Sequence, residues 1–184
     1  LKIEQEEILD AVYSLGDFYS KDYNYIMLSV GSMEGKRSWA QEDDEKWPEL
    51  VEAILSGRPN TRFFLNDFTN KMSSLRAKPY VHVINTDSMR KLGAYISLSD
   101  YFIGPDSGPM HMAGALGIKS TVMFGSIPPE ARINYYPTHS SVSLKQLPCI
   151  GCWYKSCPYD IKCMRDLTAK LVFSSVMKNM ASKR

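Results

Sequence analysis

The residues of this sequence best suited to chemistry lie where a short apolar run gives way to a helical pattern. They read Asp106-Ser107-Gly108-Pro109-Met110-His111. The apolar run 101–104 before them indicates a buried strand, and apolar residues recur at helical spacing from Met110 onward. The first turn of a helix offers backbone N–H groups without helical partners and the positive end of the helix dipole, which together attract anions. The junction therefore predicts a phosphate-binding turn.

Helix capping is the alternative explanation of the same residues. Asp106 and Ser107 are good N-cap residues, Pro109 suits a first helical turn, and Gly117 suits a helix end. Capping requires no ligand, but it also gives no reason for the histidine at position 111. His111 therefore favours the functional interpretation.

A second loop with anion-binding chemistry follows an earlier apolar run, 25–30. It spans residues 31–39 and contains Gly31, Gly35, Lys36 and Arg37. Glycine permits close backbone approach, Arg can hold a phosphate through two parallel hydrogen bonds, and Lys acts as a point charge. A solvated loop with incidental charges is the alternative. Neither a Walker loop nor the dinucleotide-binding glycine pattern is present in the sequence, so two such loops on one sheet edge favour a nucleotide or nucleotide sugar.

The elements that must position these loops alternate between strands and helices. We expect strands at 25–30, 62–65, 80–84, 101–104 and 120–125, with a sixth at 142–144. Helices are expected at the amphipathic start of the chain, at 43–55 and 68–75, after Ser88, after Asp106, and at 167–180. This alternation predicts an α/β fold: a Rossmann-like, doubly wound parallel sheet.

Length and composition restrict the class of protein. A chain of 184 residues can bury one core, and no apolar run approaches the roughly 18 residues of a membrane span. The net charge of +2 gives no argument for nucleic-acid binding. We expect a single domain over 1–184, with an entry helix in 1–22, the α/β core in 24–145, a Cys-rich segment in 146–164 and a C-terminal helix in 165–184.

All of the cysteines fall within the Cys-rich segment. Cys149 and Cys152 form a Cys-x-x-Cys pair, and Cys157 and Cys163 follow. Four thiolates can hold Zn²⁺ or iron tetrahedrally, which would make a structural site because no coordination position stays open. Two disulfides or four thiols are the alternatives, and the sequence favours the metal.

Motifs spread along the chain resemble the C-terminal half of glycosyltransferase family 9, which contains the bacterial ADP-heptose heptosyltransferases. The resemblance runs from about residue 24 to the end. The Asp-Ser-Gly-Pro-Met-His sequence is the most specific match. The matching segments are 30–32, 37–39, 47–50, 86–89, 99–104, 106–111 and 124–126.

The resemblance implies a GT-B enzyme that transfers a sugar from a nucleoside diphosphate to an acceptor hydroxyl, usually with inversion. Lys36 and Arg37 would stabilise the diphosphate and the transition state, with Asp106 and His111 near the sugar or its phosphates. The other donor contacts that the resemblance implies are Ser32 at the diphosphate, Thr86, Asp87 and Ser88 near the nucleoside, and Ser107, Gly108, Pro109 and Met110 at the phosphate turn. Glu130 and Arg132 lie in a loop that approaches the donor in the family.

The family also implies what lies outside these residues. Its general base belongs to an N-terminal acceptor domain, so we expect that domain upstream of Leu1 and expect this chain alone to bind donor without turnover. The acceptor would be a glycan, glycolipid or protein, for example a lipopolysaccharide precursor at the cytoplasmic membrane face. The basic tail, Lys178, Lys183 and Arg184, fits peripheral association with that membrane. A non-catalytic, metal-stapled interaction module and a nucleotide-sugar epimerase are the alternatives.

Overall fold

The computed structural model describes residues 1–32, 35–39, 45–68, 70–153 and 156–182. Its centre is a six-stranded sheet in the order β3-β2-β1-β4-β5-β6, and every neighbouring pair is parallel. The strands are β1 (Asn24–Ser29), β2 (Thr61–Asn66), β3 (Val81–Val83), β4 (Tyr101–Pro105), β5 (Ser120–Met123) and β6 (His139–Val142). The predicted doubly wound parallel sheet is confirmed.

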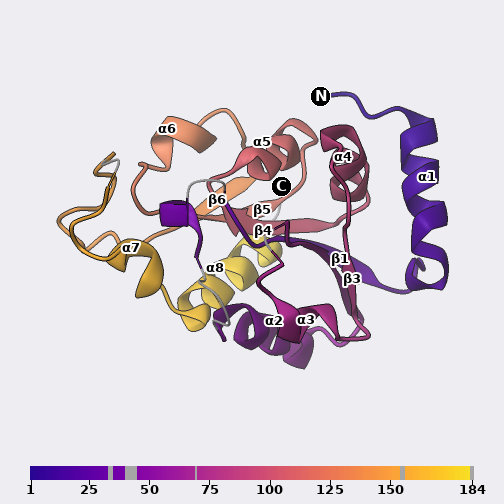
Figure 1. The fold of residues 1–184 in the computed structure, drawn as a ribbon, viewed down its shortest axis with the longest axis horizontal. Helices are drawn as coiled ribbons and strands as arrows, with labels where there is room; N and C mark the ends of the chain where they lie inside the picture. The colour runs from indigo at the N-terminus through magenta and orange to yellow at the C-terminus, as the bar shows by residue number, and fades with distance from the viewer. Residues whose placement is uncertain (33–34, 40–44, 69, 154–155, 183–184) are drawn as a thin grey trace.

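Helices cover both faces of this sheet (Figure 1). One face carries α1 (Gln5–Leu15), α4 (Met89–Ser97) and α5 (Gly108–Ala115), and the other carries α2 (Lys46–Gly57), α3 (Ser73–Arg76) and α8 (Ala169–Ala181). Short helices α6 (Glu130–Ile133) and α7 (Lys162–Arg165) lie beyond the end of β5, and two 3-10 turns are η1 (Gly16–Phe18) and η2 (Gly35–Arg37). The central strands are almost entirely buried because both of their faces are covered.

Two apolar clusters fill the space between the sheet and its helices. On the α2 and α8 side, Trp39 packs edge-on against Trp47 at 4.9 Å between ring centroids. On the other side, Phe64, Phe102 and Met110 form the centre of a second cluster. No helix among the described residues is long and apolar enough to cross a membrane.

Several predicted boundaries need correction. The sixth strand runs from His139 to Val142 rather than 142–144, because its backbone pairs with β5 from Ser120 onward. The helix expected over 68–75 begins only at Ser73, since the carboxylate of Asp67 accepts the amides of Lys71 and Met72 and holds a turn there. The last helix begins after Thr168, whose side chain accepts the amide of Leu171.

Parts of five sequence predictions lie outside the described residues. They are the helix start at Asp43, the loop residues Met33 and Glu34, position 69 in the helix expected over 68–75, positions 154–155 in the Cys-rich segment, and the tail residues Lys183 and Arg184. The described remainder of the second helix begins at Lys46, and Ser88 caps α4 as predicted by accepting the amide of Lys91.

Candidate functional site

The strand order places a topological switch point at the centre of the sheet. Strands β1 and β4 are neighbours, and the chain continues from them toward opposite edges of the sheet. In open α/β sheets, ligands bind at the carboxyl ends of the strands beside such a switch point. The segment from Val30 to Ser32 follows β1 there, and Asp106 follows β4. Both loops singled out from the sequence therefore meet at this edge.

A buried carboxylate between two guanidinium groups forms the core of the site. Asp106 is only 3% exposed. Its Oδ2 lies 3.4 Å from Arg37 Nη1 and 3.6 Å from Arg132 Nε. We call these three residues the Asp106 cluster; they come from η2, the end of β4 and α6. Two guanidinium groups beside one carboxylate bring cationic hydrogen-bond donors to this end of the sheet, and such donors suit an anionic ligand.

Hydrogen bonding within the Asp106 cluster is incomplete. Asp106 Oδ2 and Arg132 Nε are both buried, and neither makes a hydrogen bond to any described residue. The Asp106 contacts are therefore ion pairs at slightly long range, without the short N–H···O geometry of a closed, self-satisfied pair. Such an arrangement retains hydrogen-bonding capacity for a ligand.

The first turn of α5 lies directly beside this cluster. Ser107 is its N-cap residue, but the Ser107 hydroxyl donates to the carbonyl of Pro105 at 3.1 Å and makes no side-chain cap. Ser88 and Thr168, by contrast, do cap α4 and α8. Ser107 thus occupies the N-cap position that the capping interpretation predicts, but its side chain makes no capping hydrogen bond. The side chain leaves the first-turn amides of α5 to another partner, as an anion site requires.

His111 is held from the side by an aromatic residue. Its Nδ1 lies 3.2 Å from the hydroxyl of Tyr136, and the two rings meet edge to face. Burial lowers the pKa of His111; the charge of Asp106 opposes that shift, and the charges of Arg132 and Arg37 add to it. His111 is therefore neutral near pH 7, and the charges of all three members of the Asp106 cluster act on its pKa.

The predicted nucleoside-side residues form a compact turn before α4. The amide of Ser88 donates to Thr86 Oγ1 at 3.1 Å, and Asp87 is exposed. The next residue, Met89, is 55% exposed, and a Cβ placed on Gly108 would lie 3.8 Å from its terminal methyl carbon. The starts of α4 and α5 are therefore adjacent, with Met89 between them.

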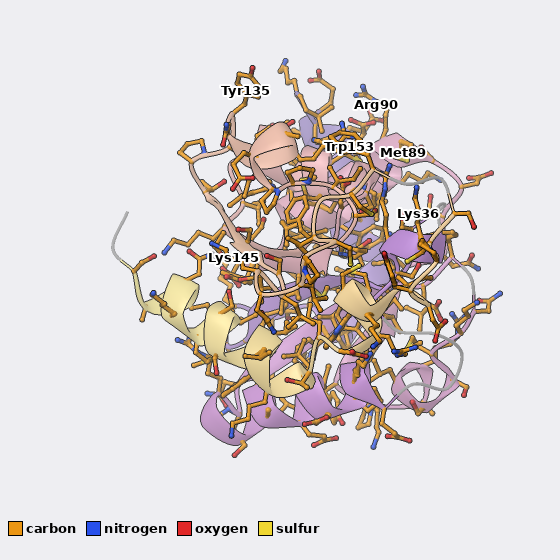
Figure 2. The ribbon with its side chains drawn as sticks, turned by 90° about the vertical axis from the view of Figure 1, so that its left-hand side faces the viewer. Lys36, Met89, Arg90, Tyr135, Lys145 and Trp153 are labelled. Atoms are coloured by element: carbon orange, nitrogen blue, oxygen red, sulfur yellow. The ribbon has the colours of Figure 1, made fainter. Side chains whose placement is uncertain are left out.

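Of the remaining predicted donor contacts, three are partly exposed and one is buried in the core. The amide of Ser32 donates to the hydroxyl of Ser38 at 3.1 Å, which folds the loop after β1 back on itself. Lys36 is half-buried on the face shown in Figure 2, and Pro109 is likewise half-buried. Met110 is fully buried in the core, so only its backbone can face a ligand.

The Cys-rich segment is attached to the same end of the sheet. The amides of Gly151 and Trp153 donate to the carbonyls of Gly125 and Ser126, each at 2.8 Å. Gly125 must be a glycine here, because a Cβ would lie 2.7 Å from Cys163 Sγ. The segment therefore lies on the loop that leaves β5, close to α6.

The four cysteines are free thiols, so the disulfide alternative is not what the structure shows. Burial raises the pKa of Cys163 to about 11, with further contributions from Cys157, Cys149 and Cys152. A groove of about 500 Å³ beside them is lined by Cys149, Cys152 and Tyr159, among others. No group of three or more metal-binding side chains is assembled among the residues that the structure describes.

Three residues of the site were missed or undervalued at the sequence level. Arg132 was expected only in a loop near the donor, yet it contacts Asp106 directly. Tyr136 holds His111, and Trp153 lies 5.6 Å from the Arg132 guanidinium, measured to its ring centroid. Beside Tyr136, His139 begins β6 and contacts the carbonyl of Met110. No periodicity or motif marks these residues, because only the tertiary fold brings them to the site.

Fold and site together define a doubly wound α/β domain with a buried carboxylate between two guanidinium groups at its switch point. The family model for glycosyltransferase family 9 (heptosyltransferase) matches residues 9–162. The chain belongs to this family, which argues against the epimerase alternative.

Individual relatives agree with this assignment. The lipooligosaccharide heptosyltransferase 2 of Campylobacter jejuni is 30% identical over 98 residues, covering 53% of this chain and 31% of the relative. The ADP-heptose lps heptosyltransferase II of E. coli has a TM-score of 0.74 at 13% identity, covering 98% of this chain and 53% of that structure. The iron-containing dodecameric glycosyltransferase TibC of E. coli has a TM-score of 0.69 at 18% identity, covering 89% of this chain and 48% of that structure. The chain thus spans about half of the GT-B enzymes whose fold it shares.

Proposed function

We propose that this domain binds the donor of a heptosyltransferase, a nucleoside diphosphate sugar of the ADP-heptose type. The Asp106 cluster beside the uncapped first turn of α5 is the observation that carries the proposal. In this assignment the diphosphate lies between Arg37 and the α5 amides. The nucleoside lies toward Thr86–Ser88, at the neighbouring start of α4.

The chemistry follows from where charge develops. As the bond between the sugar and the diphosphate breaks, the leaving diphosphate gains negative charge. Lys36, Arg37 and the α5 amides are fixed before the reaction and would stabilise that charge as it forms. Asp106 would hold Arg37 in place, and His111 would orient the turn or contact the sugar phosphate. The acceptor hydroxyl and its general base would come from a second domain, so this domain alone would bind donor without turnover.

Thermal unfolding with added nucleotides tests the donor site. We expect one of ADP, UDP and GDP, with its sugar derivatives, to stabilise the protein selectively. A ligand at about 100 times its dissociation constant adds roughly 2.7 kcal/mol. Lys36→Ala/Arg37→Ala should abolish the response.

The matched control removes the same charge elsewhere. Lys170→Ala/Lys178→Ala lies on the exposed side of α8 and should respond like the unsubstituted protein. No stabilisation by any nucleotide, or an equal response in Lys36→Ala/Arg37→Ala, would contradict the proposal.

We also propose that the four cysteines form a structural Zn²⁺ or iron site. Cys157, Cys149 and Cys152 lie near enough to Cys163 to raise its pKa, and four thiolates are a favourable donor set for either metal. The similar TibC structure is described as iron-containing. The side chains would have to converge further on binding, since the described thiols do not form a finished ligand set.

Elemental analysis of the purified protein tests this site. We expect about one ion per chain, lost in Cys149→Ser/Cys152→Ser together with part of the thermal stability. Metal-free protein whose mass shows two disulfides would contradict the proposal.

A further inference from the structure

Trp153 differs from the other two tryptophans of the chain. Trp39 and Trp47 are 1% and 0% exposed, whereas Trp153 is 53% exposed. Its backbone φ is +58°, a left-handed conformation that is unfavourable for a non-glycine residue. A residue with a large aromatic side chain therefore has an unfavourable backbone conformation and leaves about half of its surface in solvent.

Two backbone contacts hold Trp153 at this position. Its own amide donates to the carbonyl of Ser126, and the amide of Gly151 donates to the carbonyl of Gly125. Both acceptors belong to the loop that leaves β5, so the Cys-rich segment is attached to that loop. These hydrogen bonds hold the backbone of Trp153 beside the loop.

The ring lies next to the Asp106 cluster. The Arg132 guanidinium is 5.6 Å from the Trp153 ring centroid, and Arg132 Nε is 3.6 Å from Asp106 Oδ2. A cation at this distance from an aromatic face is attracted to it. Trp153 is thereby linked through Arg132 to the start of α5, and Figure 2 shows it on the same face as Met89 and Lys36.

Met89 and Trp153 are thus two exposed apolar side chains near the start of α5, and they contact different residues there. Met89 is adjacent to Gly108 and belongs to the α4 side. Trp153 reaches the cluster through Arg132 and belongs to the α6 side. If the nucleoside lies toward α4, the sugar at the other end of the diphosphate extends toward α6.

We propose that Trp153 contacts the sugar ring of the donor and is a specificity-determining residue of this site. The inference rests on the proposed donor-binding function. A pyranose presents an apolar C–H face, and an aromatic ring with half of its surface exposed offers a flat apolar partner for it. The Cys-rich segment then supplies part of the donor pocket as well as thiols.

Binding of ADP and of ADP-heptose to the same variants separates a sugar contact from a phosphate contact. Trp153→Ala should weaken ADP-heptose binding by roughly fivefold to tenfold and change ADP binding less than twofold. Trp153→Phe should retain most of the affinity for ADP-heptose. Tyr13→Ala removes another exposed aromatic residue, 80% exposed on α1, and should change neither affinity.

Intrinsic fluorescence gives a second readout, because the other two tryptophans are buried. ADP-heptose should protect the fluorescence from acrylamide quenching, ADP alone should not, and the protection should vanish in Trp153→Phe. Unchanged melting temperatures would show that the variants fold.

The outcomes distinguish this inference from the proposed function. If the unsubstituted protein binds neither ligand, the donor-binding proposal fails and this inference fails with it. If it binds both and Trp153→Ala weakens both equally or neither, the donor site stands and the sugar contact is wrong.

Discussion

Asp106 has a structural role in addition to the binding role proposed for it. Its carboxylate is buried between Arg37 and Arg132, so its charge is needed whether or not a ligand is present. Removing one member of a buried charge group leaves the remaining charges uncompensated in a poorly solvated place. Asp106 therefore stabilises the fold by offsetting charge that Arg37 and Arg132 bring to this place.

Asp106→Asn should therefore destabilise the ligand-free protein by about 1–3 kcal/mol, measured by urea unfolding. Asp160→Asn is the matched control, because Asp160 also pairs with an arginine, Arg165, but its side chain is 83% exposed. Surface pairs of this kind contribute about 0–1 kcal/mol. Equal losses in the two variants would show that the burial of Asp106 does not matter.

The strand-to-helix turn at Asp106 and Ser107 was predictable from the sequence, whereas the residues that contact it were not. Asp106 and Ser107 could be placed from the sequence because a strand and a helix flank them directly. Trp153 carried no such signal: a half-exposed Trp after a Cys-x-x-Cys pair looks like any surface aromatic until Arg132 is found beside it.

At the scale of elements, α5 is positioned by a close contact with the loop after α6. A Cβ on Gly114 would lie 2.5 Å from the ring of Tyr136, the residue that holds His111. The glycine lowers helix propensity but allows the ring to approach. The contact therefore links α5, which carries His111, to the segment that carries Tyr136, the partner of that histidine.

Gly114→Ala should destabilise the protein by about 1–3 kcal/mol, because Tyr136 must shift. Gly57→Ala in α2, where nothing lies within 4 Å of the added Cβ, should be neutral or stabilise by up to about 1 kcal/mol. Thermal unfolding measures both. A stabilised Gly114→Ala protein would mean that the Tyr136 ring moves away at no cost.

The accuracy of the element predictions followed the local strength of their signals. The buried runs of β1 and β4 were found because both faces are apolar. Strand β6 was misplaced because His139-Ser140-Ser141 is polar and half-buried, and its pairing with β5 decides its register. The start of α3 depended on Asp67 accepting two amides, which no hydrophobic pattern reveals.

At the scale of the whole molecule, all three histidines share one electrostatic tendency. Burial is the main cause that lowers the pKa of His82, His111 and His139 below the ordinary value of 6.5. The unfolded chain therefore binds more protons than the folded chain as the pH falls through and below 6.5. By linkage, the stability contributed by the neutral imidazoles is present above 6.5 and is lost on acidification.

The free energy of unfolding should accordingly decrease from pH 7.5 to pH 5.5 in urea titrations. His82→Gln removes one of the three contributions and should make that decrease smaller. Stability that rises on acidification over this range would contradict the assignment of neutral histidines.

The Asp106 cluster forms only after distant parts of the chain have come together. Arg37, Asp106 and Arg132 belong to three segments that are distant in sequence and meet only when β1, β4 and the loop after β5 are all in place. Parallel pairings of this kind close long loops and form late in folding. A growing polypeptide could not assemble the Asp106 cluster until Arg132 had left the ribosome. An anion bound at this cluster would therefore show that the whole sheet has formed, and not only its local elements.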